Sequence, residues 1–225
     1  DLSQVLRTMI GQDSIPSQVT WFDKAPIPVA NLIYSEFEPL GQLDQSFIIM
    51  QGKQGLLVVD QHVAHERILY EQFLGAAKNR KVEVQKLLFP VAIALSPGES
   101  ELLNPHLERL LELGLELESF GKNEYLLRSV PAILKNADHE KLLRETIELL
   151  PKGAHEDVLH AKYEDVLIMM SCRNAIKINH PLNLDQIRKI ISDLEQTSMP
   201  YTCPHGRPIS LLFDMDDILK KFLRK

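Results

Sequence analysis

The sequence predicts an α/β fold in two lobes, and three observations support this prediction. Two apolar runs around a glycine-containing turn, within residues 47–59, are typical of a β-hairpin. Apolar residues recur at helical spacing along several later segments and predict amphipathic helices. Residues 82–154 carry strands and helices of their own, which indicates a self-contained insertion. We therefore expect one lobe from residues 31–81 and 155–225, and a second, inserted lobe from residues 82–154.

Residues 1–30 have no lasting periodicity and are rich in polar residues and proline, so we expect a linker or a loosely attached arm. A short helix at residues 2–10 is the one element expected there. The ordered part is expected to begin near Asn31. The hairpin strands are then residues 47–50 and 56–59.

Helices and strands alternate along the rest of the chain. The expected helices are residues 61–77, 97–113, 138–150, 158–177, 183–195 and 214–223, and the expected strands are residues 82–95, 115–119, 124–130 and 209–213. Gly114 is expected to end the second helix, and Pro90 interrupts the long strand before it. Asn183 and Gln186 resemble a capping box, with Asn in place of the usual Ser or Thr. Residues 200–208 are expected to form a loop.

The composition excludes several classes of protein. The formal charge of −6 gives no overall basic signature of nucleic-acid binding, so a DNA contact would need a local basic patch or a partner that holds the DNA. No apolar run approaches the roughly 20 residues of a membrane span, and the N-terminus does not resemble a signal peptide. Cys172 and Cys203 do not suggest a secreted disulfide framework. Because the chain starts without Met, we expect a fragment of a longer protein.

The stretch from Asp60 to Glu71 places an acid and two histidines where the second hairpin strand gives way to a helix. Asp60 can cap that helix with its carboxylate. His62 and Glu66 are four residues apart, so a helix puts them on one face. Nitrogen and oxygen ligands at this spacing can bind one divalent metal ion. Folding alone does not require this pattern, which therefore predicts a metal site.

A second group of metal-type side chains lies in residues 203–208, Cys-Pro-His-Gly-Arg-Pro. Cys203 and His205 are two residues apart in a loop stiffened by two prolines, so little entropy is lost when both point to one place. Thiolate and imidazole are favoured zinc ligands. Cys-x-His alone is a weak signal, but it gains weight from the helix with His62 and Glu66 and from the spare Cys172.

Each of these residues also has a purely structural interpretation. Cys172 alone would be a small buried hydrophobic residue, Asp60 only a helix cap, and Glu71 a surface charge or an ion-pair partner. His65 lies off the face that carries the expected ligands and is interpreted as having no role. The remaining histidines are expected to be solvated surface residues: His106, His139, His155, His160 and His180.

Taken together, the motifs resemble the C-terminal domain of MutL mismatch-repair endonucleases. Residues 60–71 resemble its metal-binding motif, Asp-Gln-His-Ala-x-x-Glu-x-x-x-x-Glu, with Val63 in place of alanine. Residues 171–173 resemble its Ala-Cys-Arg/Lys element, with serine in place of alanine. Residues 203–208 match its Cys-Pro-His-Gly-Arg-Pro element in full, and residues 222–224 resemble its Phe-x-Arg element. Neither departure removes a ligand.

The resemblance implies a set of metal ligands and a set of catalytic residues. The implied ligands of one or two metal ions are His62, Glu66, Cys172, Cys203 and His205. The implied catalytic residues are Asp60, His62 and Glu66, and the implied supporting residues are Gln61, Glu71, Arg173 and Arg207. Zinc would have a structural or regulatory role, and manganese or magnesium would support nicking, since harder carboxylates suit those ions. With two clear hard ligands, DNA phosphate would have to complete a two-metal site, which would leave the enzyme latent until DNA is presented.

Residues 85–90, Gln-Lys-Leu-Leu-Phe-Pro, resemble a sliding-clamp-binding motif, with Gln85, Leu88 and Pro90 at the positions that the MutL version uses. A glutamine amide and an apolar tail can fill a small pocket on a clamp, as an extended peptide does. The alternative is an ordinary strand whose apolar residues are buried. A clamp would also bring this acidic domain to DNA.

The resemblance further implies a homodimer, with a dimerisation lobe that carries the metal site and an inserted regulatory lobe. The expected reaction is hydrolysis of one phosphodiester bond in duplex DNA during mismatch repair, in the bacterial cytoplasm at the nucleoid. Arg67, Arg173 and Arg207 are candidates for contacts with DNA phosphates. An ATPase domain would precede this fragment, which itself is expected to bind no ATP. The full-length protein would work with a MutS-type mismatch recognition protein.

Two alternatives stay open. A zinc-stabilised module for dimerisation and clamp docking, without catalysis, would keep the cysteines and histidines but would not need Asp60. A single-zinc hydrolase acting on a small substrate would use His62 and Glu66, and it would need a deep apolar pocket near the metal.

Overall fold

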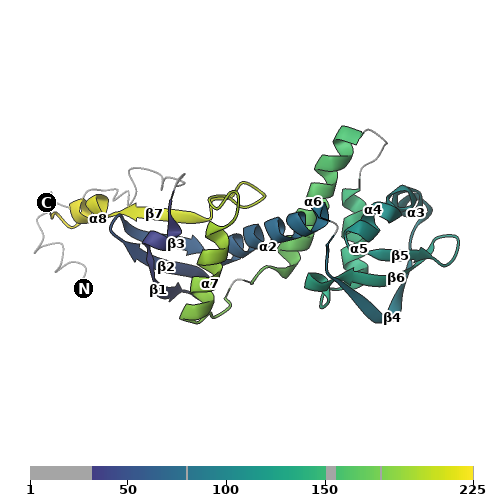
Figure 1. The fold of residues 1–225 in the computed structure, drawn as a ribbon, viewed down its shortest axis with the longest axis horizontal. Coiled ribbons are helices and arrows are strands. Elements are labelled where there is room, and N and C mark those ends of the chain that lie inside the picture. The colour runs from purple at the N-terminus through teal and green to yellow at the C-terminus, as the bar shows by residue number, and fades with distance from the viewer. Residues whose placement is uncertain (1–31, 80, 151–155, 178, 225) are drawn as a thin grey trace, which may run out of the picture.

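The computed structural model describes residues 32–79, 81–150, 156–177 and 179–224, without the side chains of residues 156–162. It has two antiparallel sheets, at opposite ends of an elongated molecule, with the helices α2 (Gln61–Lys78) and α6 (Glu156–Asn174) between them (Figure 1). The predicted α/β fold class is confirmed. The predictions for residues 1–30, including the helix at residues 2–10, lie outside the described residues.

The first sheet has four strands in the order β1-β2-β3-β7. They are β1 (Glu38–Leu43), β2 (Phe47–Gly52), β3 (Gly55–Asp60) and β7 (Ser210–Asp214). The predicted hairpin is confirmed, because β2 pairs with β3 from Phe47 opposite Asp60 to Gly52 opposite Gly55. Gly55 has a φ of +140°, and a Cβ atom there would lie 2.1 Å from the backbone oxygen of Phe213. The turn therefore requires glycine.

Helices cover one face of this sheet. Alternate residues of β2 and β3 point into the core, where Leu57 and Val59 are fully buried. They pack with the apolar sides of α2 and of α7 (Leu184–Glu195). The capping box before α7 is confirmed: Asn183 accepts a hydrogen bond from the Gln186 amide, and the Gln186 side chain accepts one from the Asn183 amide. The 3₁₀ turn η1 (Tyr34–Glu36) lies beside α7.

The second sheet has three strands in the order β4-β6-β5. These are β4 (Val84–Ala94), β5 (Glu116–Ser119) and β6 (Glu124–Pro131). The helical elements around it are α3 (Pro97–Leu103), η2 (Asn104–His106), α4 (Leu107–Glu112), η3 (Ala132–Leu134) and α5 (His139–Leu149). The pairing of β4 with β6 shifts register between Lys86 and Val91, around the predicted interruption at Pro90.

Each sheet has a separate core, and the second core extends beyond residues 82–154. Phe73 of α2 joins it, as do Tyr163, Val166, Leu167 and Met170 of α6. Helices α2 and α6 thus contribute side chains to the packing around the second sheet. The division of the chain into lobes near residues 82 and 154 stays a prediction.

Two predictions are wrong in this part of the chain. The helix expected at residues 97–113 is divided into α3, η2 and α4, because Pro105 has no amide hydrogen and cannot continue an α-helix. His106 is not solvated: it is 7% exposed, and its Nδ1 lies 2.6 Å from the Tyr163 hydroxyl. His139 is half-buried and His180 is exposed, while the side chains of His155 and His160 lie outside the description.

The chain ends, after β7, in the helix α8 (Met215–Lys221), with Asp214 as its N-cap. Within the described residues, no helix is both long enough and apolar enough to cross a membrane.

Candidate metal centre

The site begins where β3 passes into α2. Asp60 is the N-cap of α2, as predicted, and its Oδ1 accepts hydrogen bonds from the amides of His62 at 2.9 Å and Val63 at 3.1 Å. A negative charge at this end also suits the helix dipole. The cap uses one carboxylate oxygen, so Oδ2 has no hydrogen bond within the described residues.

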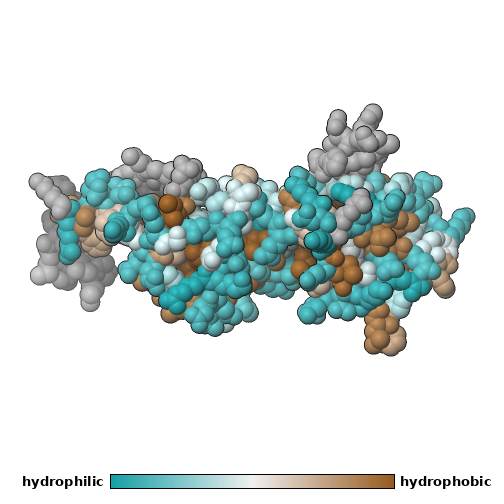
Figure 2. All heavy atoms as spheres, in the orientation of Figure 1, coloured by the Kyte–Doolittle hydropathy of each residue, from teal (hydrophilic) through white to brown (hydrophobic). Residues whose placement is uncertain are grey.

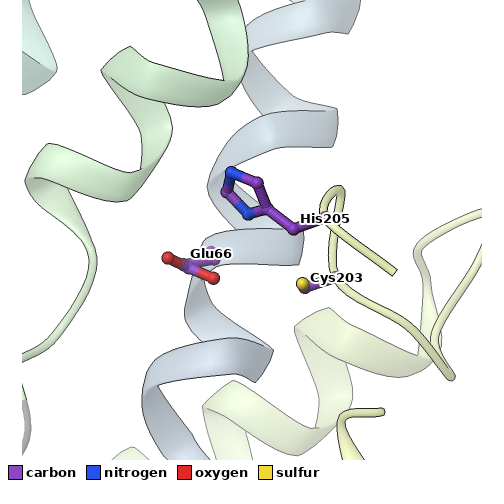
Figure 3. A group of neighbouring side chains, drawn as sticks. All are labelled: Glu66, Cys203 and His205. Atoms are coloured by element: carbon purple, nitrogen blue, oxygen red, sulfur yellow. The ribbon is translucent and has the colours of Figure 1, made fainter. Parts of the chain in front are cut away.

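Three of the predicted ligands come together one turn further along α2. The ligand atoms of Glu66, Cys203 and His205 all lie within 4.8 Å of one another. Figure 3 shows Glu66 on α2 and the other two side chains on the loop between α7 and β7, with all three directed toward one region. The Glu66 side chain is 3% exposed and Cys203 is 1% exposed. A buried carboxylate next to a buried thiol requires a nearby positive charge.

Backbone hydrogen bonds fix the loop that carries Cys203 and His205. The Cys203 amide donates to the Arg207 carbonyl at 2.9 Å, and the Gly206 amide donates to the Cys203 carbonyl at 2.9 Å. Thr202 and Pro208 form an isolated β-bridge at the base of the loop. Gly206 has a φ of +79°, in the left-handed region where glycine carries no steric cost. The loop therefore presents its ligands from a fixed backbone.

His62 lies beside this group, with its Nε2 3.3 Å from Glu66 Oε1. Its Nδ1 is 2.8 Å from the carbonyl oxygen of Ile176, which can only accept, so Nδ1 carries the hydrogen. In the neutral ring, Nε2 then presents a lone pair to a carboxylate oxygen. Two acceptors at this distance repel each other unless a proton or a metal ion lies between them. Metal-binding histidines typically donate their second ring N–H in this way.

Cys172 reaches the same region from α6, and its thiol donates a hydrogen bond to Glu66. Burial raises the pKa of Cys172 to about 12, and the hydrogen bond to Glu66 and the nearby Cys203 act in the same direction. A thiolate at this position therefore needs a cation to stabilise it. The donor set of carboxylate, imidazole and thiol fits zinc. The structure brings Glu66, Cys203 and His205 together as one group, and His62 and Cys172 each interact with Glu66 without being members of that group.

The predicted supporting residues hold the centre together in different ways. Gln61 is fully buried, and its amide donates to the carbonyls of Gln45 at 2.6 Å and His180 at 3.1 Å. Glu71 accepts hydrogen bonds from the amide and the hydroxyl of Ser198, both at 2.8 Å. These contacts attach the first residue and the middle of α2 to loops elsewhere in the chain.

The three arginines expected to contact DNA differ in what they bind. Arg67 is 5% exposed and donates to the Thr202 carbonyl at 2.7 Å, so it is buried and already bound. Arg173 bonds with Glu145 of α5 at 2.8 Å. Arg207 is half exposed, donates to Glu66 Oε2 at 2.7 Å, and also hydrogen-bonds Cys203. Burial makes the expectation wrong for Arg67, whereas Arg207 has both exposure and proximity to the centre.

Sequence reasoning missed His65. Its Nδ1 accepts a hydrogen bond from the Ile176 amide at 2.8 Å, so His62 and His65 together bind both backbone groups of one residue. Burial, and then the neighbouring His62, lower the pKa of His65 and favour its neutral ring. The i, i+3 spacing of two histidines on a helix was the available signal, but their shared partner is more than 100 residues away in sequence.

The motif for clamp binding lies on the second sheet, away from the metal ligands. Gln85 is exposed and pairs in register with Val130 of β6. Leu88 and Phe89 are 87% and 79% exposed, so the alternative of a strand with a buried apolar segment does not hold for these two residues.

One cavity has a volume of about 640 Å³, and its lining residues include Leu40, Lys53, Leu56, Met215 and Ile218. None of the predicted site residues lines it. This cavity therefore gives no support to a hydrolase that encloses a small substrate near the metal centre.

The fold and the site define a mixed α/β domain with a carboxylate–imidazole–thiol metal centre between a helix and a loop. The family model described as the MutL C terminal dimerisation domain matches residues 40–182. The chain belongs to this family.

Full-length relatives agree with this assignment. The DNA mismatch repair protein MutL of Koribacter versatilis is 35% identical over 203 residues, which are 90% of this chain and 31% of that protein. The MutL proteins of Halothermothrix orenii and of an Exiguobacterium species are 38% and 39% identical, over 83% and 82% of this chain. The chain spans less than a third of the length of each of these three relatives.

Proposed function

We propose that this chain is the metal-dependent endonuclease domain of a DNA mismatch repair protein, and that it nicks one strand of duplex DNA. The observation that carries the proposal is the convergence of Glu66, Cys203 and His205, with His62 and Cys172 beside them. Neither sheet requires a buried carboxylate, an imidazole and two thiols at one point. The family of the chain and the names of its relatives support a role in mismatch repair.

The donor types divide the centre into two chemical parts. Cys172, Cys203 and His205 are soft or intermediate ligands that suit zinc, and the carboxylates of Asp60 and Glu66 suit manganese or magnesium. When bound, a divalent ion would supply Lewis-acid stabilisation of the negative charge on the phosphate that reacts. Glu66 is the residue common to both parts, because its two oxygens contact His62 on one side and Arg207 on the other.

The residues of the chain orient this chemistry. The Ile176 carbonyl holds the His62 ring so that Nε2 is directed toward Glu66. The N-cap hydrogen bonds hold Asp60 by Oδ1 and leave Oδ2 for a ligand. The second oxygen of a capping carboxylate is thus positioned without loss of side-chain entropy on binding.

Contact with a sliding clamp would supply the DNA affinity that a domain with a net charge of −6 lacks. We propose that residues 85–90 bind the clamp. Figure 2 shows an apolar knob at the end of the molecule that carries β4, and the most exposed apolar residues of that strand are Leu88 and Phe89. Large apolar side chains exposed at adjacent positions are typical of a partner-binding site.

We also propose that a second copy of the chain packs on the face of the first sheet opposite α2 and α7. We call this the outer face. It consists of the outward residues of β2, β3 and β7: Phe47, Ile49, Leu56, Val58, Leu211 and Phe213. A sheet face lined by apolar residues is a typical interface for a symmetric dimer.

Substitution of Asp60 by Asn tests the nuclease assignment. Asn is as good an N-cap as Asp, so the fold of α2 should be kept while the charged ligand is lost. We expect nicking of supercoiled plasmid, with manganese and the clamp present, to fall by about 100-fold. Asp138→Asn is the matched control, because Asp138 caps α5 in the same way and lies outside the site. Nicking by Asp60→Asn at the rate of the unsubstituted chain would contradict the assignment.

The alternative function is a zinc-stabilised module for dimerisation and clamp docking, favoured by the cysteine and histidine ligands. The same experiment separates the two functions. The module without catalysis would bind zinc and form dimers, and neither the unsubstituted chain nor Asp60→Asn would nick plasmid.

A further inference from the structure

The ion pair between Glu66 and Arg207 joins a buried group to an exposed one. The Glu66 side chain is 3% exposed, the Arg207 side chain is 52% exposed, and Arg207 Nη2 lies 2.7 Å from Glu66 Oε2. Taking a carboxylate out of water is costly unless a counter-charge accompanies it. Arg207 supplies that charge from the edge of the site.

No other cation in the described part of the chain is placed to take over this role. Arg67 is buried one residue along α2, but it donates to the Thr202 carbonyl and to Glu71. Arg173 bonds with Glu145. His62 lies 3.3 Å from Glu66 and is charged only when protonated.

Both partners of Arg207 belong to the group of metal ligands. Its guanidinium hydrogen-bonds Glu66 and Cys203, and the ligand atoms of these two residues lie within 4.8 Å of each other. A divalent ion at this point would use the same lone pairs and would repel the guanidinium. The Arg207 side chain and the metal therefore cannot both have full use of these partners.

We propose that Arg207 and the divalent ion compete for Glu66 and Cys203, and that metal binding releases the Arg207 guanidinium to bind a phosphate of the DNA substrate. This inference rests on the proposed function. In the metal-free centre, Arg207 supplies the positive charge next to Glu66. In the centre that holds a metal ion, Arg207 binds a phosphate.

The loop allows this change without a backbone movement. The Arg207 carbonyl is held by the Cys203 amide, and the β-bridge from Thr202 to Pro208 closes the loop. The guanidinium lies at the end of a long, half-exposed side chain and can turn toward solvent. Arginine presents five N–H donors in a planar fork that matches a phosphate. The released Arg207 guanidinium would lie next to the DNA strand that the metal ion binds.

The competition also couples metal binding to DNA binding. A phosphate that holds the released guanidinium removes the competitor of the metal, so DNA raises the metal affinity. By thermodynamic linkage, the metal raises the DNA affinity by the same factor. A centre built in this way is weakly loaded until DNA arrives.

Substitution of Arg207 by Gln in the 225-residue chain tests the competition, because the competition predicts a rise in zinc affinity and a supporting role predicts a fall. Without DNA, we expect zinc to bind Arg207→Gln about tenfold more tightly than the unsubstituted chain, since one charge-assisted hydrogen bond no longer has to be broken. The measurement is competition with a chromogenic zinc chelator. Metal-free Arg207→Gln should also unfold at a lower temperature, because Glu66 stays buried without its counter-charge.

Two further variants serve as controls. Arg207→Lys keeps a positive charge near Glu66 and should bind zinc as the unsubstituted chain does. Arg188→Gln removes an arginine on α7 that is also 52% exposed, and it should change neither the zinc affinity nor the unfolding temperature.

Zinc-loaded Arg207→Gln should bind duplex DNA with a salt dependence reduced by about one phosphate contact.

The outcomes separate this inference from the proposed function. Weaker or unchanged zinc binding by Arg207→Gln would overturn the competition, and Arg207 would then support the metal instead. If the unsubstituted chain binds no zinc at all, the proposed metal centre itself fails. If metal-free Arg207→Gln is unfolded by circular dichroism, the salt dependence of DNA binding by its zinc-loaded form decides instead: a dependence equal to that of the unsubstituted chain would overturn the release of Arg207 to a phosphate.

Discussion

The backbone amide and carbonyl of one residue, Ile176, connect two histidines of α2 at the metal centre. His65 accepts a hydrogen bond from the Ile176 N–H, and the Ile176 C=O accepts one from His62, so His65 holds the residue whose carbonyl fixes the tautomer of His62. His65 is thus a positioning residue. The prediction that His65 has no role came from its place off the ligand face, and that place is what directs it toward Ile176.

Substitution of His65 tests this role. His65→Leu removes the acceptor, and we expect zinc affinity to fall by about tenfold, the usual effect of losing a residue that orients a ligand. His65→Asn keeps an acceptor atom in the place of Nδ1 and should restore the affinity. The nitrogen chemical shifts of His62, read by NMR, should show a mixture of tautomers in the leucine variant alone. Equal affinity and unchanged shifts in His65→Leu would contradict the role.

Tyr34 gives a pH-dependent prediction at the same scale. Its ring is fully buried, and its hydroxyl donates to the Pro200 carbonyl at 2.8 Å and lies 3.1 Å from the Ser210 hydroxyl. Burial raises the pKa of Tyr34 from 10.0 to about 12. Because the folded state holds this proton more tightly than the unfolded chain does, the stabilising effect is complete below pH 10 and is lost as the pH rises to about 12.

Tyr34→Phe isolates this effect. The free energy of unfolding, measured with urea, should fall less steeply between pH 10 and pH 12 in the variant than in the unsubstituted chain. The two curves should run parallel below pH 9. Parallel curves across the whole range would show that Tyr34 titrates alike in the folded and unfolded states.

At the scale of elements, sequence patterns succeeded where the cause is local. The hairpin of β2 and β3 and the capping box of α7 depend on neighbours within a few residues, and both were predicted. Periodicity alone failed at Pro105, where a local breaker overrides the apolar pattern. The contact of His106 with Tyr163 joins residues 57 apart in sequence, so no local pattern could indicate it.

The strand β4 gives a prediction at the element scale. Its pairing with β6 is in register up to Lys86 and resumes at Val91, so residues 87–90 lie outside the regular ladder. Leu88 is 87% exposed there, and its truncation should cost less than about 0.5 kcal/mol of stability. A combined change of Gln85 and Leu88 to Ala should therefore leave the fold intact. It should abolish clamp-stimulated nicking, because both residues lie in the proposed clamp site.

The control for this experiment is Leu111→Ala on α4, a leucine that is also exposed, at 54%. It should be stimulated by the clamp like the unsubstituted chain. Dimerisation and basal nicking should not change in either variant. Full stimulation of the Gln85 and Leu88 variant would exclude residues 85–90 as the clamp site.

The packing of the whole molecule brings the site residues together, and no single segment of the sequence could predict this. Asp60, His62 and Glu66 were identified from spacing on one helix, and the types of the other ligands from their chemistry. Their meeting depends on α6 and on the 203–208 loop packing against α2, across more than 100 residues of sequence. The pairing of Arg207 with Glu66 follows from the same packing, and no pattern in the sequence separates Arg207 from Arg67.

The outer face gives the prediction at this scale. Ile49, Val58 and Leu211 form one row across three strands, since Ile49 pairs with Val58 and Val58 with Leu211. Their neighbours Ile48, Leu57 and Val59 point the other way, into the core under α2 and α7. A charge in this row would therefore face the partner and leave the core unchanged.

Val58→Asp should convert the dimer to a monomer, as measured by light scattering after size exclusion at micromolar concentration. In a two-fold interface each substitution occurs twice, so two carboxylates would be buried without counter-charges. Leu111→Asp, on the far side of the molecule, should remain dimeric. Zinc binding should be the same in both variants, because neither Val58 nor Leu111 is one of the proposed metal ligands. A folded Val58→Asp protein that still forms dimers would place the dimer interface on another surface.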